Sequence, residues 1–127
     1  MKIIVQNTSG VPIYEQIKTQ IKAAIFSDEL KENDALPSIR QLAKDLRISV
    51  ITTTRAYNDL EQEGFINSIQ GKGCFVRKKD NKMIREQALR EIESGLNTAV
   101  SAAKNAQIPK NDLYEVLSAV IKEENYE

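Results

Sequence analysis

Histidine and tryptophan are absent from this chain of 127 residues, and cysteine occurs once, as Cys74. Without histidine the chain cannot build a histidine-ligated zinc site, a Ser-His-Asp or Cys-His catalytic arrangement, or an imidazole pH switch. A single cysteine cannot form a disulfide within the chain, so the sequence is not that of a disulfide-stapled secreted scaffold.

Long apolar runs and recognisable catalytic patterns are also missing. No apolar run approaches the roughly 20 residues of a membrane-spanning helix. No acid pair, nucleophile–base pair or phosphate-binding loop stands out. We therefore expect a soluble protein that is not an enzyme, that needs no cofactor or metal, and that does not bind a membrane.

Charge is balanced overall but unevenly distributed. The 18 lysines and arginines match 18 aspartates and glutamates, yet residues 70–79 contain four basic side chains and no acidic one. A local basic surface on a neutral chain favours a polyanionic partner such as nucleic acid. A solvated charged surface with no partner would give the same pattern, so charge alone leaves both interpretations open.

The spacing of apolar residues predicts five helices and one hairpin. A period of three to four residues predicts helices over about 13–27, 38–46, 49–63, 82–106 and from Pro109 onward. Ser38 and Ser49 stand where the second and third helices need N-caps. Two β-prone runs, Phe65–Ile69 and Cys74–Arg77, flank a glycine-rich connection and predict a β-hairpin.

This order of elements is typical of a winged helix-turn-helix. The predicted fold class is mainly α with a small β-hairpin: a DNA-binding domain over residues 1–79, followed by a two-helix C-terminal dimerisation region over residues 80–127. The candidate recognition helix begins at Ser49, and its first two turns carry hydroxyls and one arginine but no acid. The positive end of the helix dipole and the free N–H groups there favour an approach to phosphate.

The two tail helices carry apolar residues at helical spacing, but about 45 residues cannot close a core alone. These faces must therefore pack on the DNA-binding domain or on a second chain, and the sequence does not decide between the two. A homodimer explains both the apolar faces and the function, because two-fold symmetry places two recognition helices about one DNA turn, roughly 34 Å, apart.

Several motifs also resemble one known family. They are Pro12–Ile17, Leu36–Ala43, Thr52–Glu61, Glu63–Ile66 and Gly71–Val76. In this order and spacing they resemble the GntR family of bacterial transcriptional regulators over about residues 11–77. The short two-helix tail is similar to that of the YtrA-like subfamily, since other subfamilies carry much larger effector domains.

The resemblance implies specific DNA contacts. At the start of the second helix, Ser38 and Arg40 match family positions that touch phosphate or a base edge. On the recognition helix the matching positions are Ser49, Thr52 and Thr54, with Arg55 beside them on the DNA backbone. At the wing tip, which reaches the minor groove, they are Gln70, Gly71 and Lys72.

The chain departs from the family pattern at three places. Val50 stands where family members often have arginine, and we expect it to contact a thymine methyl instead, because apolar contact is how that group is read. Arg47 replaces the usual glycine before the recognition helix, and Asn33 replaces another glycine, a mild change because asparagine tolerates left-handed geometry.

The sequence therefore predicts a sequence-specific transcriptional regulator, most simply a homodimeric repressor of the bacterial cytoplasm that associates with the nucleoid. Its partner would be a double-stranded palindromic operator, with the recognition helix in the major groove and the wing on the adjacent minor groove. Two alternatives stand beside this prediction. One is a winged-helix module for protein–protein interaction. The other is a sensor whose unidentified small-molecule effector binds at the dimer seam or between the domains.

Overall fold

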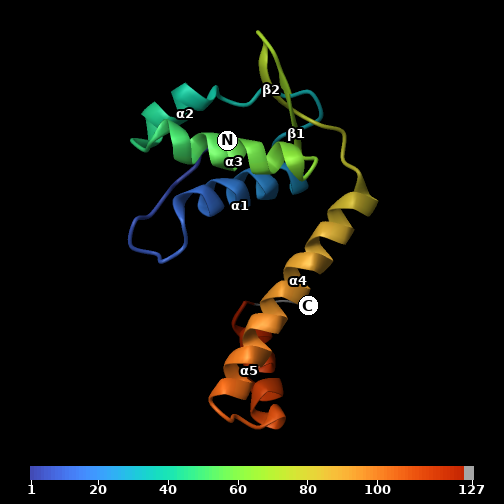
Figure 1. Cartoon of the computed structure of the whole chain (residues 1–127). Coiled ribbons are helices and arrows are strands. Elements are labelled where there is room, and N and C mark those ends of the chain that lie inside the picture. Colours follow the sequence, from blue (N-terminus) through green and yellow to red (C-terminus); the bar gives the residue numbers. More distant parts are fainter. Residues whose placement is uncertain (125–127) are drawn as a thin grey trace. The chain divides into compact units, whose positions relative to one another are not determined.

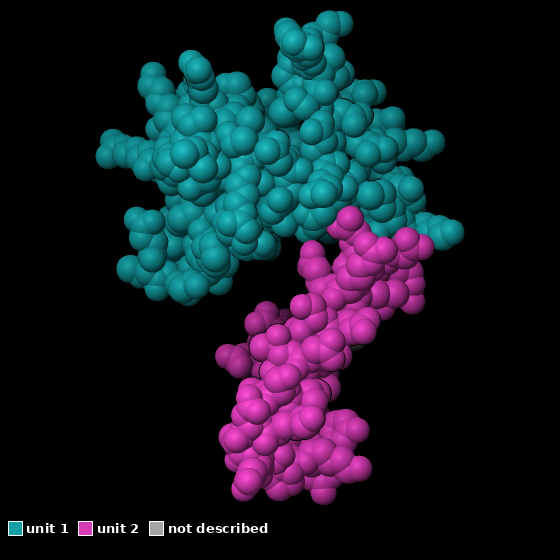
Figure 2. Space-filling model, in the orientation of Figure 1, with its two compact units in different colours: residues 1–84 teal, residues 85–127 magenta. Residues whose placement is uncertain are grey.

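A computed structural model describes residues 1–124 of the chain, which is divided into two compact units. The first unit is Met1–Ile84 and the second is Arg85–Glu127 (Figure 2). Each unit is described by itself below.

The first unit contains three helices and a two-stranded antiparallel sheet (Figure 1). The elements are α1 (Ile13–Phe26), α2 (Ile39–Leu46), α3 (Val50–Gln62), β1 (Ile66–Ile69) and β2 (Gly73–Val76). Their order is that of the predicted winged helix-turn-helix, and their bounds agree with the sequence prediction to within one or two residues.

Helix α3 is central to the core, since α1, α2 and β1 all pack against it. The apolar spacing on α1 buries Ile17 and Ile21 completely, and Ala56 and Leu60 of α3 are buried opposite them. Burying an isoleucine or leucine side chain contributes about 1.5–3 kcal/mol. These positions therefore account for much of the stability of the unit.

An ion-pair cluster joins α1 to α3 beside this core. Lys18 Nζ lies 2.9 Å from Glu63 Oε2 and 3.3 Å from Asp59 Oδ2, and Lys22 Nζ lies 2.7 Å from Glu63 Oε1. Burial alone lowers the pKa of Lys18, but the hydrogen bond to Glu63 and the surrounding negative charges outweigh it and raise that pKa. Burial likewise raises the pKa of Glu63, but hydrogen bonds from the two lysines outweigh it and lower that pKa.

A third segment of the chain pairs with the hairpin, in addition to the two predicted strands. Strands β1 and β2 pair in the register Ile66↔Val76 to Ile69↔Gly73. The segment before α2, for which the sequence predicts no strand, also lies along β2: the Leu36 N–H donates to the Cys74 carbonyl at 2.9 Å, and Ala35 forms a bridge to Phe75. The paired residues lie far apart in the sequence. Their pairing therefore leaves no pattern in the local sequence from which it could be predicted.

The residues before α1 are held by two glutamine side chains. The Gln20 amide accepts from Ile4 N–H at 2.9 Å and donates to the Ile4 carbonyl at 2.6 Å. The Gln16 amide does the same for Gln6, at 2.8 and 2.9 Å. Each amide therefore satisfies one residue's backbone donor and acceptor, as a neighbouring β-strand would. Ile3, directly before the first anchored residue, is buried in the core.

Helix α4 (Asn81–Asn105) begins in the first unit and continues into the second, where α5 (Lys110–Glu123) follows it. Its first turn contacts the end of α3, because Met83 Sδ lies only 2.7 Å from the place where a Cβ on Gly64 would stand. Ile84 packs against the core of the first unit. Between α4 and α5 the chain turns at Gln107, whose φ is 57°.

The second unit buries little of its apolar surface. Among its described residues only Ala103 is buried. The large apolar side chains that stay exposed are Leu89, Ile92, Leu96, Val100, Ile108, Tyr114, Val116, Leu117, Val120 and Ile121. The predicted stripe is thus present on both helices, and within a single chain most of it faces solvent.

Candidate nucleic-acid interface

The start of α2 presents two of the predicted contacts. Ser38 is the N-cap, and its hydroxyl accepts from the Gln41 N–H at 3.0 Å. The Gln41 side-chain amide does not bond back to the Ser38 backbone, as it would in a capping box; it donates to Asp45 Oδ1 at 2.7 Å. Ser38 and Arg40 are both exposed, so the cap leaves the Arg40 guanidinium open to a ligand.

The turn between α2 and α3 depends on an arginine in a glycine conformation. Arg47 is left-handed, with φ 58° and ψ 46°, and its backbone ends α2. An L-residue in this region costs roughly 1–2 kcal/mol relative to glycine. Tyr57 of α3 holds the other end of α2, since its buried hydroxyl donates to the Pro37 carbonyl at 2.7 Å. Burial also raises the pKa of Tyr57, which keeps that donor protonated.

The first turn of α3 is closed by hydroxyl groups. The Ser49 hydroxyl accepts from the Thr52 N–H at 3.0 Å and donates to the Thr52 hydroxyl at 2.8 Å. Thr53 is fully buried and donates to the Ser49 carbonyl at 3.2 Å, while Thr54 is half-buried. Ser49 and Thr52 therefore lie at the start of α3 as predicted, but their hydroxyls bond to each other.

Two apolar side chains are exposed at the same turn. Val50 is 49% exposed and Ile51 is 82% exposed. Val50 was among the predicted contacts, whereas Ile51 was not. One signal for it was present in the sequence: Ile51 falls outside the spacing of Thr53, Ala56, Tyr57 and Leu60, which form the buried face.

Arg55 also makes a contact within the domain that the sequence did not predict. Its guanidinium carbon lies 3.7 Å from the centre of the Tyr14 ring, in a cation–π contact with α1. Such a contact contributes about 0.5–1 kcal/mol at an exposed site. The stack restrains the guanidinium on the α1 side of the recognition helix.

The wing tip carries the remaining predicted contacts. Gln70, Gly71 and Lys72 are exposed, and the Lys72 N–H closes the turn on the Ile69 carbonyl at 2.9 Å. Gly71 has φ 78°, a conformation that glycine adopts without strain. Glu61 of α3 accepts from the Ser68 N–H at 2.7 Å, which ties the hairpin to α3.

These groups share one side of the first unit. Figure 1 shows α2 and the tip of the hairpin on the side of α3 opposite α1. Eight of the predicted residues are exposed on this domain, whereas Thr52 and Thr54 of α3 are half-buried. The eight are Ser38, Arg40, Ser49, Val50, Arg55, Gln70, Gly71 and Lys72.

The family model for bacterial regulatory proteins of the gntR family matches residues 13–76, half of the chain. The chain belongs to the gntR family. Its winged helix-turn-helix is that of a DNA-binding transcriptional regulator.

One curated relative matches this gntR-family regulator over most of its length, and two solved structures match smaller parts of it. The chain is 30% identical over 112 residues to the HTH-type transcriptional repressor YtrA of Bacillus subtilis, covering 88% of this chain and 86% of that protein. The solved structure of YtrA from Sulfolobus acidocaldarius, a GntR-family transcription factor, is 39% identical, with a TM-score of 0.58 over 72% of this chain and 97% of the other. The DNA-binding domain of AraR, solved in complex with operator ORX1, is 26% identical, with a TM-score of 0.53 over 60% of this chain and 95% of that one.

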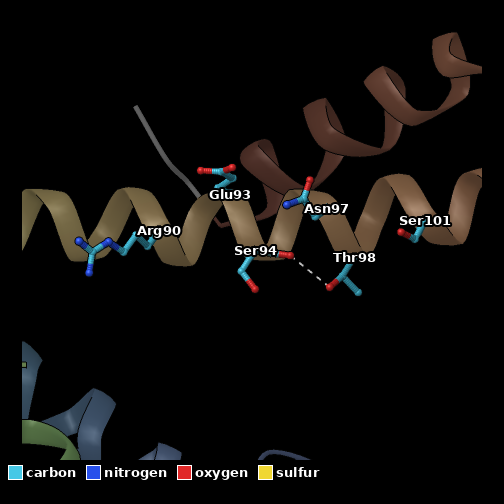
Figure 3. A pocket seen from close by; sticks show the side chains of 6 residues that line it. All are labelled: Arg90, Glu93, Ser94, Asn97, Thr98 and Ser101. Atoms are coloured by element: carbon cyan, nitrogen blue, oxygen red, sulfur yellow. Dashed lines mark hydrogen bonds between the residues drawn. The ribbon is translucent and has the colours of Figure 1, made fainter.

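The second unit of this gntR-family regulator has two contrasting surfaces. An apolar groove of about 560 Å³ lies between α4 and α5 and is lined by Leu96, Ala99, Val100, Lys110, Leu113, Tyr114, Val116, Leu117 and Val120. On another face of α4, Figure 3 shows the polar side chains of Arg90, Glu93, Ser94, Asn97, Thr98 and Ser101. There the Thr98 hydroxyl donates to the Ser94 carbonyl at 3.1 Å, as in an ordinary solvated helix face.

Two kinds of feature are absent from the described residues. No helix within residues 1–124 is long and apolar enough to span a bilayer. The same part of the chain contains no cluster of three or more cysteine, aspartate or glutamate side chains suited to a metal ion.

Proposed function

We propose that this regulator is a homodimeric repressor that binds a palindromic operator and blocks transcription by occupying it. Helix α3 enters the major groove, and the wing reaches the adjacent minor groove. One observation carries the proposal: α2 and the tip of the hairpin lie on the same side of α3 (Figure 1), and Arg40 of α2, the acid-free start of α3 and the wing tip are all exposed.

The chemistry of this surface suits duplex DNA. The major groove is about 12 Å wide and admits one α-helix. The N-terminal turn of α3 adds a positive dipole end without a repelling carboxylate. We assign base or phosphate contacts to Ser38, Arg40, Ser49, Val50, Thr52 and Thr54, a backbone contact to Arg55, and minor-groove contacts to Gln70, Gly71 and Lys72.

The exposed apolar faces of α4 and α5 support dimerisation. Contiguous apolar surfaces of this kind are rare on monomers and mark interaction sites. A second copy of the chain would cover the groove lined by Leu96 and Leu117. The resulting two-fold symmetry would set two α3 helices about one DNA turn apart.

The relatives support the proposal that this chain represses transcription and acts in the bacterial cytoplasm. YtrA of Bacillus subtilis is named a repressor, and the AraR domain is seen on its operator. By analogy we assign this chain to repression, in the bacterial cytoplasm and on the nucleoid when bound.

The apolar groove also favours a second candidate function. Its volume of about 560 Å³ falls in the range of small-molecule pockets, about 300–1,000 Å³. An apolar effector seated there would alter how two tail units pack and so would control operator affinity. A protein–protein interaction module remains the alternative if no duplex is bound.

Fluorescence anisotropy of the full chain with a labelled duplex from upstream of its own gene tests DNA binding. A scrambled duplex is the control, and the log–log slope against salt should be about −0.9 per phosphate contacted. Arg40→Ala should weaken binding by about 5- to 150-fold, on the scale of one lost bidentate contact of about 1–3 kcal/mol, whereas the exposed Arg90→Ala should not. Equal, salt-insensitive binding to both duplexes would refute the proposal.

Sedimentation of matched tail variants tests the dimer. Leu96→Glu places a charge in the apolar groove and should give a monomer with weaker operator binding. Ser94→Glu places the same charge on the polar face of α4 and should leave the dimer intact. A Leu96→Glu protein that still sediments as a dimer would exclude this face as the interface.

A further inference from the structure

The first turn of α3 has its polarity reversed relative to an ordinary surface helix. Ile51 is 82% exposed, the most exposed of the large apolar side chains in the described chain, whereas the Thr53 hydroxyl side chain is fully buried. Val50 beside it is 49% exposed. Packing within the domain does not account for Ile51, because its side chain contributes almost nothing to the core.

The polar groups around Ile51 are already engaged. Ser49 and Thr52 bond to each other through their hydroxyls at 2.8 Å, and the Thr53 hydroxyl is bonded to the Ser49 carbonyl. Arg55, one turn on, is stacked on Tyr14. The large side chains that this turn exposes to the major groove are therefore the apolar ones of Val50 and Ile51, beside the small hydroxyl side chains.

The major groove offers one apolar feature, the C5 methyl group of thymine. We propose that Ile51 is a specificity-determining residue of this regulator, and that it reads a thymine by packing against that methyl group. Val50 packs against the methyl of a neighbouring thymine. The inference rests on the proposed operator binding by α3 and adds to it the base that this turn selects.

Removal of a single methyl group from the DNA tests the inference directly. Duplexes selected by the wild-type protein from a random-sequence pool supply the bound sequence. Each thymine in it is then replaced, one at a time, by deoxyuridine, which keeps the base pairing and O4 but lacks the C5 methyl. At two neighbouring thymines in each half-site, one read by Ile51 and one by Val50, the wild-type affinity should fall by about fourfold for each replacement, the value of burying one methyl-sized group.

The matching protein variant should remove that discrimination. Ile51→Ala should bind the thymine and deoxyuridine duplexes equally at the Ile51 position, and both with the affinity of wild type for the deoxyuridine duplex or lower. Val50→Ala should retain the discrimination at the Ile51 position and lose it at the neighbouring thymine. Ile69→Ala removes another exposed isoleucine, 46% exposed on the wing, and should retain both.

The outcomes separate this inference from the function on which it rests. In one outcome the wild-type protein selects a defined sequence and yet binds thymine and deoxyuridine with equal affinity at every position. That result would overturn the methyl contact of Ile51 and leave operator binding standing. An Ile51→Ala protein that discriminates between thymine and deoxyuridine as strongly as the wild type would also overturn the methyl contact and leave operator binding standing. Failure to select any sequence would overturn both. Unchanged thermal unfolding of Ile51→Ala, expected from its exposure, confirms that the comparison involves a folded protein.

Discussion

Substitution of Gly64 by alanine tests how the end of α3 is joined to the first turn of α4. Gly64 has φ +86°, where an L-residue is strained by about 1–2 kcal/mol. Its added Cβ would also stand 2.7 Å from Met83 Sδ and 2.8 Å from Met83 Cε. Carbon contacts are optimal at about 3.5–4.0 Å, so the flexible Met83 side chain must move.

The two contributions can be separated by a double-mutant cycle. Displacing Met83 from its preferred rotamer should cost about 1 kcal/mol, so Gly64→Ala should lower the free energy of unfolding by about 2–3 kcal/mol in the wild type. In a Met83→Ala background only the backbone strain remains, about 1–2 kcal/mol. The coupling between the two positions should thus be about 1 kcal/mol.

Thermal unfolding followed by circular dichroism at one fixed protein concentration measures these values. For a domain of this size each kcal/mol shifts the midpoint by about 4–8 °C. Gly71→Ala is the matched control, since Gly71 has φ +78° but nothing within 4 Å of its added Cβ. Its cost should be insensitive to Met83→Ala. Equal costs of Gly64→Ala in both backgrounds would refute the assigned contact.

Two further predictions concern stability. Arg47→Gly should relieve the left-handed strain at the end of α2 and raise the free energy of unfolding by up to about 1 kcal/mol, measured from the urea midpoint; a loss of stability would show that the Arg47 side chain makes stabilising contacts. The pKa of Glu63 is lowered in the folded state, so its contribution is fully present above its ordinary pKa of 4.5 and is lost as the pH falls through the lowered value. Glu63→Gln should therefore cost about 2 kcal/mol at pH 7, the scale of lost hydrogen bonds to a charged group, and should reduce the loss of stability below pH 4.5, as followed by denaturant titration; an unchanged acid profile would exclude Glu63 as the group responsible.

Local patterns were enough to predict the elements of the first unit. Ser38 and Ser49 are N-caps because a hydroxyl before an apolar-periodic run satisfies free N–H groups. The hairpin was predictable because Gly71 and Gly73 supply the positive φ angles of its turn.

The features that the sequence missed depend on contacts between distant residues. The cation–π contact of Arg55 with Tyr14 requires α1 and α3 to be packed first. The exposure of Ile51 is a different case, because the spacing of the buried face of α3 already carried a signal for it. The tail is an intermediate case: its apolar residues were predictable, whereas what covers them does not follow from local spacing.

The two glutamines on α1 have a consequence for how the protein can change over time. Because Gln16 and Gln20 bind the main chain at Gln6 and Ile4, not their side chains, the anchoring ignores which amino acids stand there. The exposed side chains at these two positions are free to drift through neutral substitution. Proline alone is excluded, because it has no N–H to donate. The two glutamine amides can thus hold the segment before α1 in place while the residues at positions 4 and 6 vary.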